Sequence, residues 1–248
     1  MKSVNLAPIP NTTRTPAMQS KPLFVAVIAC SLSVLVTTAP AEELGKPLLT
    51  EQTASGELVG WRSFHQEPAT STGAVWRLAD GVLVCKGSPL GYICTKKEYA
   101  NFVLRLEWRW PADKEPGKGG VLIRTTGPDK IWPKSLEAQI NVPDAGDFWG
   151  LDGYTLDGPA KRRKSLEHPQ FGKLIHLAKT KPAEKKPGQW NTYEIIADGP
   201  VVTLKINGKV VNQATGCKPG SGVICLTSEG NEIHFRNVRL TPIIKPKE

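Results

Sequence analysis

A regular alternation of apolar and polar side chains limits what this chain can fold into. From Phe102 to Trp110, every second residue is large and apolar, and three of the four residues between them are charged. A period of two residues is typical of a β-strand with one buried and one solvated face. Helical patterns are scarce, so we expect an all-β protein. Similar strand-like segments occupy 81–86, 91–95, 120–125, 136–142, 190–197, 201–206, 222–227 and 233–242.

Turn residues indicate how these segments are connected. Asn207-Gly208 is a two-residue hairpin signal, and Asp198-Gly199-Pro200 separates two further segments. Nine or more short strands without intervening helices predict an antiparallel jelly-roll β-sandwich, in which strands near both ends of the chain meet in one sheet. The Pro- and Lys-rich stretch 152–188 is weakly patterned and is predicted to be a long insertion loop.

The first 41 residues have the order of a secretory signal peptide. Basic residues up to Lys21 precede an apolar run from Leu23 to Val36, and Ala39 and Ala41 satisfy the rule for signal peptidase. A membrane-spanning helix is the competing interpretation, but a largely apolar run of 14 residues falls short of the roughly 20 that a bilayer needs. We therefore expect cleavage after residue 41, a secreted or periplasmic protein, and no stable membrane insertion afterwards. The predicted boundaries are a signal peptide (1–41), a linker (42–56), one sandwich domain (57–243) and a tail (244–248).

The formal net charge of +9 is unevenly distributed along the chain. Residues 1–41 carry +3 and residues 161–187 carry +7, which leaves −1 for the rest. A nearly neutral body argues against nucleic acid as a partner. The basic segment 161–187 leaves open that the protein is a surface interaction protein, which adheres to a partner through this segment.

Four cysteines follow the leader, namely Cys85, Cys94, Cys217 and Cys225. In an oxidising compartment they allow three disulfide pairings, and the sequence does not choose among them. The local pairs, Cys85 with Cys94 and Cys217 with Cys225, each bracket a glycine-containing turn. Free buried thiols are the alternative. The cysteine and histidine spacing does not match a structural zinc site.

Polar residues two apart on a strand project from one face of a sheet, where a ligand can meet them. Glu137, Gln139 and Asn141 share such a face, and Arg124 and Glu107 lie on similar faces of two other strands. If these strands are neighbours, carboxylate and guanidinium groups meet over one surface. A solvated outer face with ion pairs is the alternative for each strand.

Tryptophans flank the Glu137 strand, with Trp132 before it and Trp149 after it. Aromatic rings beside carboxylates and amides are typical of sugar sites, and core packing is the alternative. The aspartates between residues 144 and 157 leave the binding of a divalent cation as an open alternative. Their spacing does not match a calcium-binding loop, so we expect no metal or cofactor. The histidines are scattered and are interpreted as surface residues, namely His65, His168, His176 and His234.

A series of motifs resembles, in order, those of the 3-keto-disaccharide hydrolase domain family. The resemblance covers about residues 57–243. It implies a concanavalin A-like jelly roll, often exported, that acts on glycosides whose glucose ring is oxidised at C3. The motifs are 76–84, 91–93, 97–99, 102–110, 119–124, 136–140, 188–191, 206–208 and 228–238.

The implied chemistry is proton abstraction next to a carbonyl. A ketone at C3 acidifies the C2 proton, so a base removes it, the enolate expels the C1 substituent, and water later adds. The resemblance points to Arg124, Glu137 and Gln139 as the face that meets the sugar. Our hypothesis is that Glu137 is the base or acid and Arg124 the partner of the oxyanion. The candidate substrate-binding residues are Gln139, Asn141, Trp132, Glu107, Asp147 and Glu229.

A non-catalytic carbohydrate-binding module is the main alternative, because the same sandwich and the same side chains serve binding without turnover. A retaining glucanase is less favoured, since its Glu-x-Asp-x-x-Glu strand does not occur in this sequence. The expected partner is a carbohydrate in either case. The sequence leaves the sugar, the linkage and the oligomeric state open.

Overall fold

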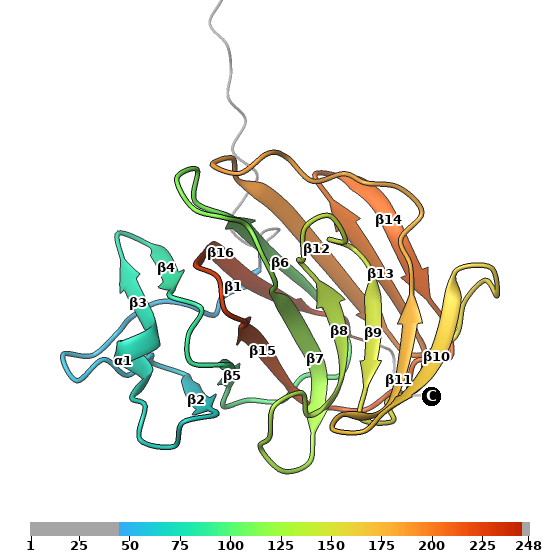
Figure 1. The fold of residues 1–248 in the computed structure, drawn as a ribbon, viewed down its shortest axis with the longest axis horizontal. Coiled ribbons are helices and arrows are strands. Elements are labelled where there is room, and N and C mark those ends of the chain that lie inside the picture. The colour runs from blue at the N-terminus through green and yellow to red at the C-terminus, as the bar shows by residue number, and fades with distance from the viewer. Residues whose placement is uncertain (1–44, 245–248) are drawn as a thin grey trace, which may run out of the picture. The chain divides into compact units, whose positions relative to one another are not determined.

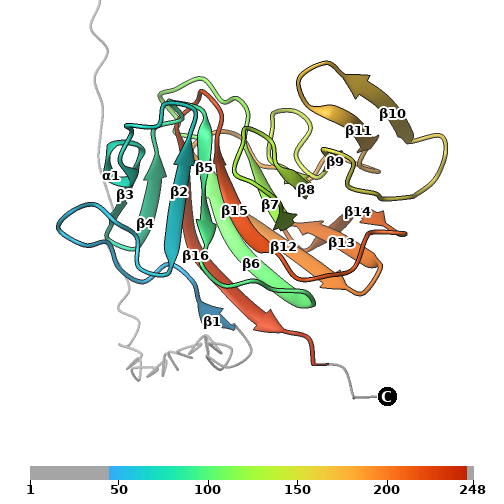
Figure 2. The same ribbon diagram turned by 90° about the horizontal axis from the view of Figure 1, so that it is seen from below.

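Two antiparallel sheets of eight strands each form the described part of the chain (Figures 1 and 2). The structure is a computed structural model that describes residues 45–244. The predicted signal peptide, the start of the linker and the end of the tail lie outside these residues. One short helix, α1 (Thr72–Val75), precedes β3. Between residues 45 and 244, no helix has the length and apolarity needed to cross a membrane.

The first sheet, called sheet A, contains the strand whose alternation was most regular. In β6, buried residues alternate with half-buried ones from end to end, as predicted. The short strand β1 pairs with the last strand, β16, so strands near both ends of the described chain do meet in one sheet. The order in sheet A is β14 (Lys209–Ala214), β13 (Val201–Ile206), β12 (Asn191–Asp198), β6 (Phe102–Arg109), β16 (Ile233–Pro242), β4 (Val82–Cys85) and β3 (Trp76–Ala79), with β1 (Lys46–Pro47) beside β16.

The second sheet, called sheet B, differs because its central strands are buried on both faces. Nearly every residue of β5, β7, β8 and β15 is buried. One face packs on sheet A, and the other carries a second, smaller apolar cluster. The order in sheet B is β10 (Arg163–His168), β11 (Gly172–Leu177), β9 (Phe148–Leu151), β8 (Lys134–Gln139), β7 (Gly120–Thr126), β15 (Val223–Ser228), β5 (Gly91–Thr95) and β2 (Trp61–His65).

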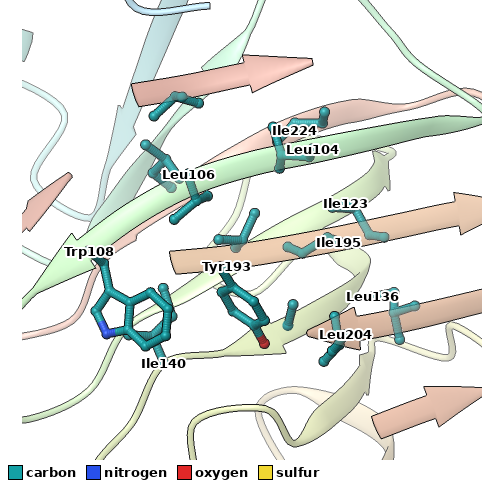
Figure 3. Packing of buried hydrophobic residues seen from close by; sticks show 14 of the residues in the cluster. Leu104, Leu106, Trp108, Ile123, Leu136, Ile140, Tyr193, Ile195, Leu204 and Ile224 are labelled. Carbon is teal, nitrogen blue, oxygen red and sulfur yellow. The ribbon is translucent and has the colours of Figure 1, made fainter. Parts of the chain in front are cut away.

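The main core lies between the two sheets. Leu104 and Ile195 of sheet A are neighbours in the ladder between β6 and β12, and both are fully buried. Ile123 and Leu136 of sheet B belong to the same cluster, as Figure 3 shows. Contact between inward-facing apolar rows of two sheets is the packing expected of a sandwich.

The prediction that 152–188 is a loop was wrong for its central part. Residues 163–177 form the hairpin of β10 and β11, and β11 pairs with β9, so the hairpin extends sheet B. The reason is the apolar content of β11, where Ile175 and Leu177 join the main core while Leu174 joins the smaller cluster. This packing outweighs the Lys-rich composition of the segment.

Candidate functional site

The polar residues predicted on β8 lie on the outer face of sheet B, away from sheet A. Leu136 and Ala138 belong to the main core, so Glu137 and Gln139 between and after them project to the opposite face. The cross-strand neighbours of Glu137 are Leu122 on β7 and Trp149 on β9. Glu137 therefore sits in the middle of the sheet rather than at its edge.

Glu137 and Glu229 form a pair of desolvated carboxyl groups on this face. Glu137 is 8% exposed and forms no salt bridge with residues 45–244. Burial and the nearby charge of Glu229 raise the pKa of Glu137 well above its ordinary value. Burial also raises the pKa of Glu229 to about 7, although Thr227 and Lys118 act in the opposite direction.

One carboxyl oxygen of Glu229 receives no hydrogen bond within residues 45–244 that would offset the loss of water. Its Oε1 atom is buried without a hydrogen-bond partner among the described residues. A buried carboxylate oxygen without a donor strongly disfavours the charged form. The pKa values of both carboxyl groups are thus raised, which is an arrangement suited to acid–base chemistry.

Gly120 makes room for the Glu137 carboxyl group. Gly120 lies beside Gln139 in the ladder between β7 and β8. A Cβ atom at residue 120 would lie 2.5 Å from Oε1 of Glu137. Thr227 fixes this strand from the other side, because its Oγ1 accepts from the Gly120 N–H at 2.7 Å. The absence of a side chain at 120 thus determines where the carboxyl group rests.

A chain of contacts continues from Gln139 across the face. Trp149 donates its indole N–H to Oε1 of Gln139 at 3.2 Å. The Trp149 ring stacks on His176 with 4.4 Å between ring centroids, and Nε2 of His176 lies 2.6 Å from Oδ2 of Asp147. Gln139, Trp149, His176 and Asp147 thus orient one another beside the carboxyl pair.

His176 was missed by the sequence analysis, which placed it on the surface of a basic loop. Its side chain is only 20% exposed, and it lies on β11, directly opposite Trp149. The signal that would have revealed the strand is the short apolar run from Leu174 to Ala178, which only His176 interrupts. Such a run after Gly172 is consistent with a buried strand, although it does not tell which face His176 occupies.

Arg124 does not join Glu137. Its Nη2 and Nε donate to the carbonyl of Ala100 at 3.0 and 3.2 Å, and its Nη1 donates to the carbonyl of Lys218 at 3.3 Å. The register of β7 shifts between Ile123 and Thr126, and Arg124 has a φ of 52°. This bulge turns the Arg124 side chain away from the face on which Leu122 and Glu137 lie. The expectation that the Arg124 and Glu137 side chains meet over one surface is therefore not met.

Three other predicted site residues make contacts that do not involve the carboxyl pair. The Oδ1 atom of Asn141 accepts from the N–H of Gly119 at 2.8 Å, so it fixes the chain before β7. Trp132 packs edge-to-face on Phe171 near the β10–β11 hairpin. Glu107 is on sheet A, where it accepts hydrogen bonds from Arg236 and Asn237.

A cavity of about 500 Å³ opens over the outer face of sheet A. Its lining includes the charged residues Arg105, Glu107, Glu194 and Lys205. Its carboxylates are held by cations, because Glu194 pairs with Arg105 at 2.7 Å and with Lys205 at 2.8 Å. Although burial opposes it, the hydrogen bonds and charges of these cations lower the pKa of Glu194. Carboxylates that stay ionised and paired are poor acids and bases, so the carboxyl pair on sheet B is the better candidate for chemistry.

The described residues offer little to a metal ion. No group of three or more His, Cys, Asp and Glu side chains within 45–244 has the arrangement of a metal site. Asp147, from the loose aspartate cluster, is engaged by His176 and by the backbone N–H of Lys179 at 2.9 Å.

Residues 52–241 match the model of the 3-keto-alpha-glucoside-1,2-lyase-like domain. The chain belongs to this family. The match includes nearly all of the sandwich, leaving out β1 and the last residue of β16, and confirms the resemblance seen in the motifs. No curated protein matches the chain.

Solved structures confirm the architecture. A protein of Parabacteroides distasonis ATCC 8503 that carries the name of a glycosyl hydrolase has a TM-score of 0.52 and 23% identity, covering 74% of this chain and 99% of its own. Another from that organism has a TM-score of 0.51 and 17% identity, covering 75% and 89%. The carbohydrate-binding module CBM66 from Bacillus subtilis has a TM-score of 0.51 and 12% identity, covering 78% and 99%. At these identities the likeness establishes the jelly-roll fold, which serves glycosidases and binding modules alike.

The raised pKa of Glu229 predicts a pH-dependent stability. The folded chain binds this proton more tightly than the unfolded chain, whose value is near 4.5. The free energy of unfolding should therefore fall as pH rises from about 4.5 to about 7, by about 1 to 3 kcal/mol from this group. Urea denaturation at pH 4.5 and pH 8 should show a smaller fall for Glu229→Gln than for the unsubstituted protein. Glu67→Gln, at an exposed position, is the matched control; parallel pH curves for Glu229→Gln and the unsubstituted protein would contradict the assignment.

The contact at Gly120 predicts a difference between two neighbouring glycines. Gly120→Ala places a methyl group against the Glu137 carboxyl and should lower the free energy of unfolding by about 1 to 3 kcal/mol. Gly119→Ala meets its nearest atom at 3.4 Å, an ordinary contact, and should cost less than about 1 kcal/mol. Urea denaturation at one pH compares them. Equal costs would show that Glu137 moves away freely.

Proposed function

We propose that this chain cleaves the glycosidic bond of 3-keto-glycosides on the outer face of sheet B. The observation that carries the proposal is the pair of carboxyl groups of Glu137, which is buried, and Glu229, which is half-buried with one buried oxygen; both have raised pKa values and no salt bridge to a described residue. Membership of the lyase-like family supports the keto-sugar as the substrate class. Gln139, Trp149 and His176 beside the pair supply the amide, aromatic and imidazole groups that bind sugars.

The two carboxyl groups take different roles in this proposal. The pKa of Glu229 is about 7, so this group is partly ionised at neutral pH and is the base that removes the C2 proton. Burial and the nearby charge of Glu229 raise the pKa of Glu137 well above its ordinary value, which favours the neutral form, so we assign this group the role of hydrogen-bond donor. A neutral carboxylic acid in a desolvated site is a good donor to an enolate oxygen.

The remaining steps conserve protons and atoms. The enolate expels the oxygen at C1, which takes up the proton held by Glu229, and the C1–C2 double bond of an enone is left. Water then adds to C1 and returns a proton to C2, which completes a net hydrolysis. Arg124 has no part in this scheme, because its guanidinium group serves the Ala100 and Lys218 carbonyls.

The neighbouring aromatic and polar groups position the sugar in this proposal. Trp149 is held by Gln139 and by stacking on His176, so its ring cannot turn freely. Asp147 fixes the orientation of His176 through the 2.6 Å contact. A rigid ring and an oriented imidazole provide a preorganised surface for one pyranose.

Export is part of the same proposal, since residues 1–41 have the order of a signal peptide. Sequencing the N-terminus of the protein recovered outside the cytoplasm should give Glu42 as the first residue. Recovery of Met1 from that fraction would contradict cleavage.

A carbohydrate-binding module remains the second candidate, and the cavity over sheet A favours it. That cavity of about 500 Å³ is lined by Thr192, Asn237 and charged groups that are already paired. Its size is within the range of small-ligand sites. A site of this kind binds hydroxyl groups without supplying a base.

Glu137→Gln tests catalysis against binding. The substitution keeps the size of the side chain but removes the acidic proton, so release of sugar from a 3-keto-glucoside should fall about 100-fold or more. Mass spectrometry of the released product measures the rate. Glu107→Gln, at an ion-paired carboxylate of sheet A, is the matched control and should retain the rate.

Two outcomes would overturn the proposal. Undiminished turnover by Glu137→Gln would remove this residue from the chemistry. If the unsubstituted protein binds 3-keto-glucosides or plain oligosaccharides but releases no sugar, the chain is a binding module.

A further inference from the structure

Two cysteines lie directly opposite each other on neighbouring strands of sheet B. Cys94 on β5 and Cys225 on β15 are Cα partners in an antiparallel ladder. Partners in such ladders have Cα atoms about 4.5 to 5.5 Å apart, which is within the roughly 4.4 to 6.8 Å that a disulfide spans. Both side chains belong to the smaller apolar cluster on the outer face. The two sulfur atoms therefore point to the same side of the sheet.

The other two cysteines lie on the opposite side of sheet B. Cys85, on β4 of sheet A, and Cys217, in the loop before β15, are both members of the main core. A bond from Cys85 to Cys94, or from Cys217 to Cys225, would have to pass from one face of the sheet to the other. The hairpin pairings suggested by sequence distance are therefore incompatible with this fold.

The surroundings favour ionisation of Cys94. Its hydrogen bond with Cys225 and then the positive charge of Arg62 lower the pKa of this thiol, although burial acts against the shift. Arg62 is the ladder partner of Cys94 on β2 and is held by Asp129 at 2.6 Å. Asp129 also accepts from the Tyr92 hydroxyl at 2.8 Å, which secures the β7–β8 loop next to the cysteine pair.

We propose that Cys94 and Cys225 form a cross-strand disulfide when the chain folds in the presence of a small-molecule disulfide. The Cys94 thiolate attacks the small disulfide, forms a mixed disulfide and releases one small thiolate. The Cys225 thiolate then attacks the sulfur of Cys94, closes the protein disulfide and releases the second. Two protein thiols lose two protons and two electrons, and the small disulfide is reduced to two thiols.

Exchange belongs to the folding stage because both thiols are inaccessible afterwards. Cys94 and Cys225 are 0% exposed in the folded domain, and a buried thiol does not meet a reagent in solution. The bond would join β5 to β15, the strand that carries Thr227 and leads to Glu229. Closing so long a segment should raise the melting temperature by roughly 10 °C.

Refolding the unsubstituted protein with a mixture of reduced and oxidised glutathione tests this directly. Denaturation, alkylation of free thiols and peptide mapping should then yield the Cys94 and Cys225 peptides linked and short of two hydrogen atoms. Cys85 and Cys217 should be alkylated. A parallel sample refolded with excess reductant should carry four alkyl groups in this region and melt about 10 °C lower.

Two variants separate this pairing from its rivals. Cys85→Ala combined with Cys217→Ala should keep the linked peptides, whereas Cys225→Ala should leave Cys94 open to alkylation after denaturation. Free thiols at 94 and 225 in the oxidised sample, or links from either to Cys85 or Cys217, would overturn the proposal. If Cys225→Ala does not fold, the peptide map of the unsubstituted protein decides the question.

Discussion

Burial of both faces of sheet B is the constraint on which the candidate site depends. The central strands of this sheet pack against sheet A on one side and hold a second apolar cluster on the other. A polar group placed among them loses its water, and its charged form is destabilised unless a cation compensates. Glu137 and Glu229 have no such cation in a salt bridge within the described chain. Their raised pKa values follow from this environment.

The outer face of sheet A shows the opposite arrangement with similar residue types. Strands β6 and β12 alternate regularly, so their outward side chains remain hydrated. Glu107 pairs with Arg236 and Glu194 pairs with two cations. One fold thus carries two polar faces of different chemical character, and the difference arises from hydration rather than from composition.

The sequence predicted the sandwich because alternation along β6 reports directly which side chains are buried. It also placed Glu137 and Gln139 on one face, since the period of two holds through β8. The same rule failed for Arg124, where a bulge inserts one extra residue and reverses the side. A bulge leaves no mark in a pattern of apolar and polar residues, so sequence alone could not have revealed it.

His176 and the cysteine pair illustrate a second limit. The lysines of segment 161–187 obscured the short apolar run of β11, so the composition of the whole segment outweighed its local pattern. The opposition of Cys94 and Cys225 depends on which strands become neighbours in sheet B, and they are far apart along the chain. Strand order is a property of the complete fold.

The position of β10 has a consequence for the behaviour of the protein in concentrated solution. This strand ends sheet B, its residues are mostly exposed, and Arg163 and Lys164 lie on it. An open strand edge is a template on which a second molecule can add its own strand. Charged side chains on such an edge, here Arg163, Lys164 and Glu167, keep the strand hydrated and oppose the addition of a strand from another molecule.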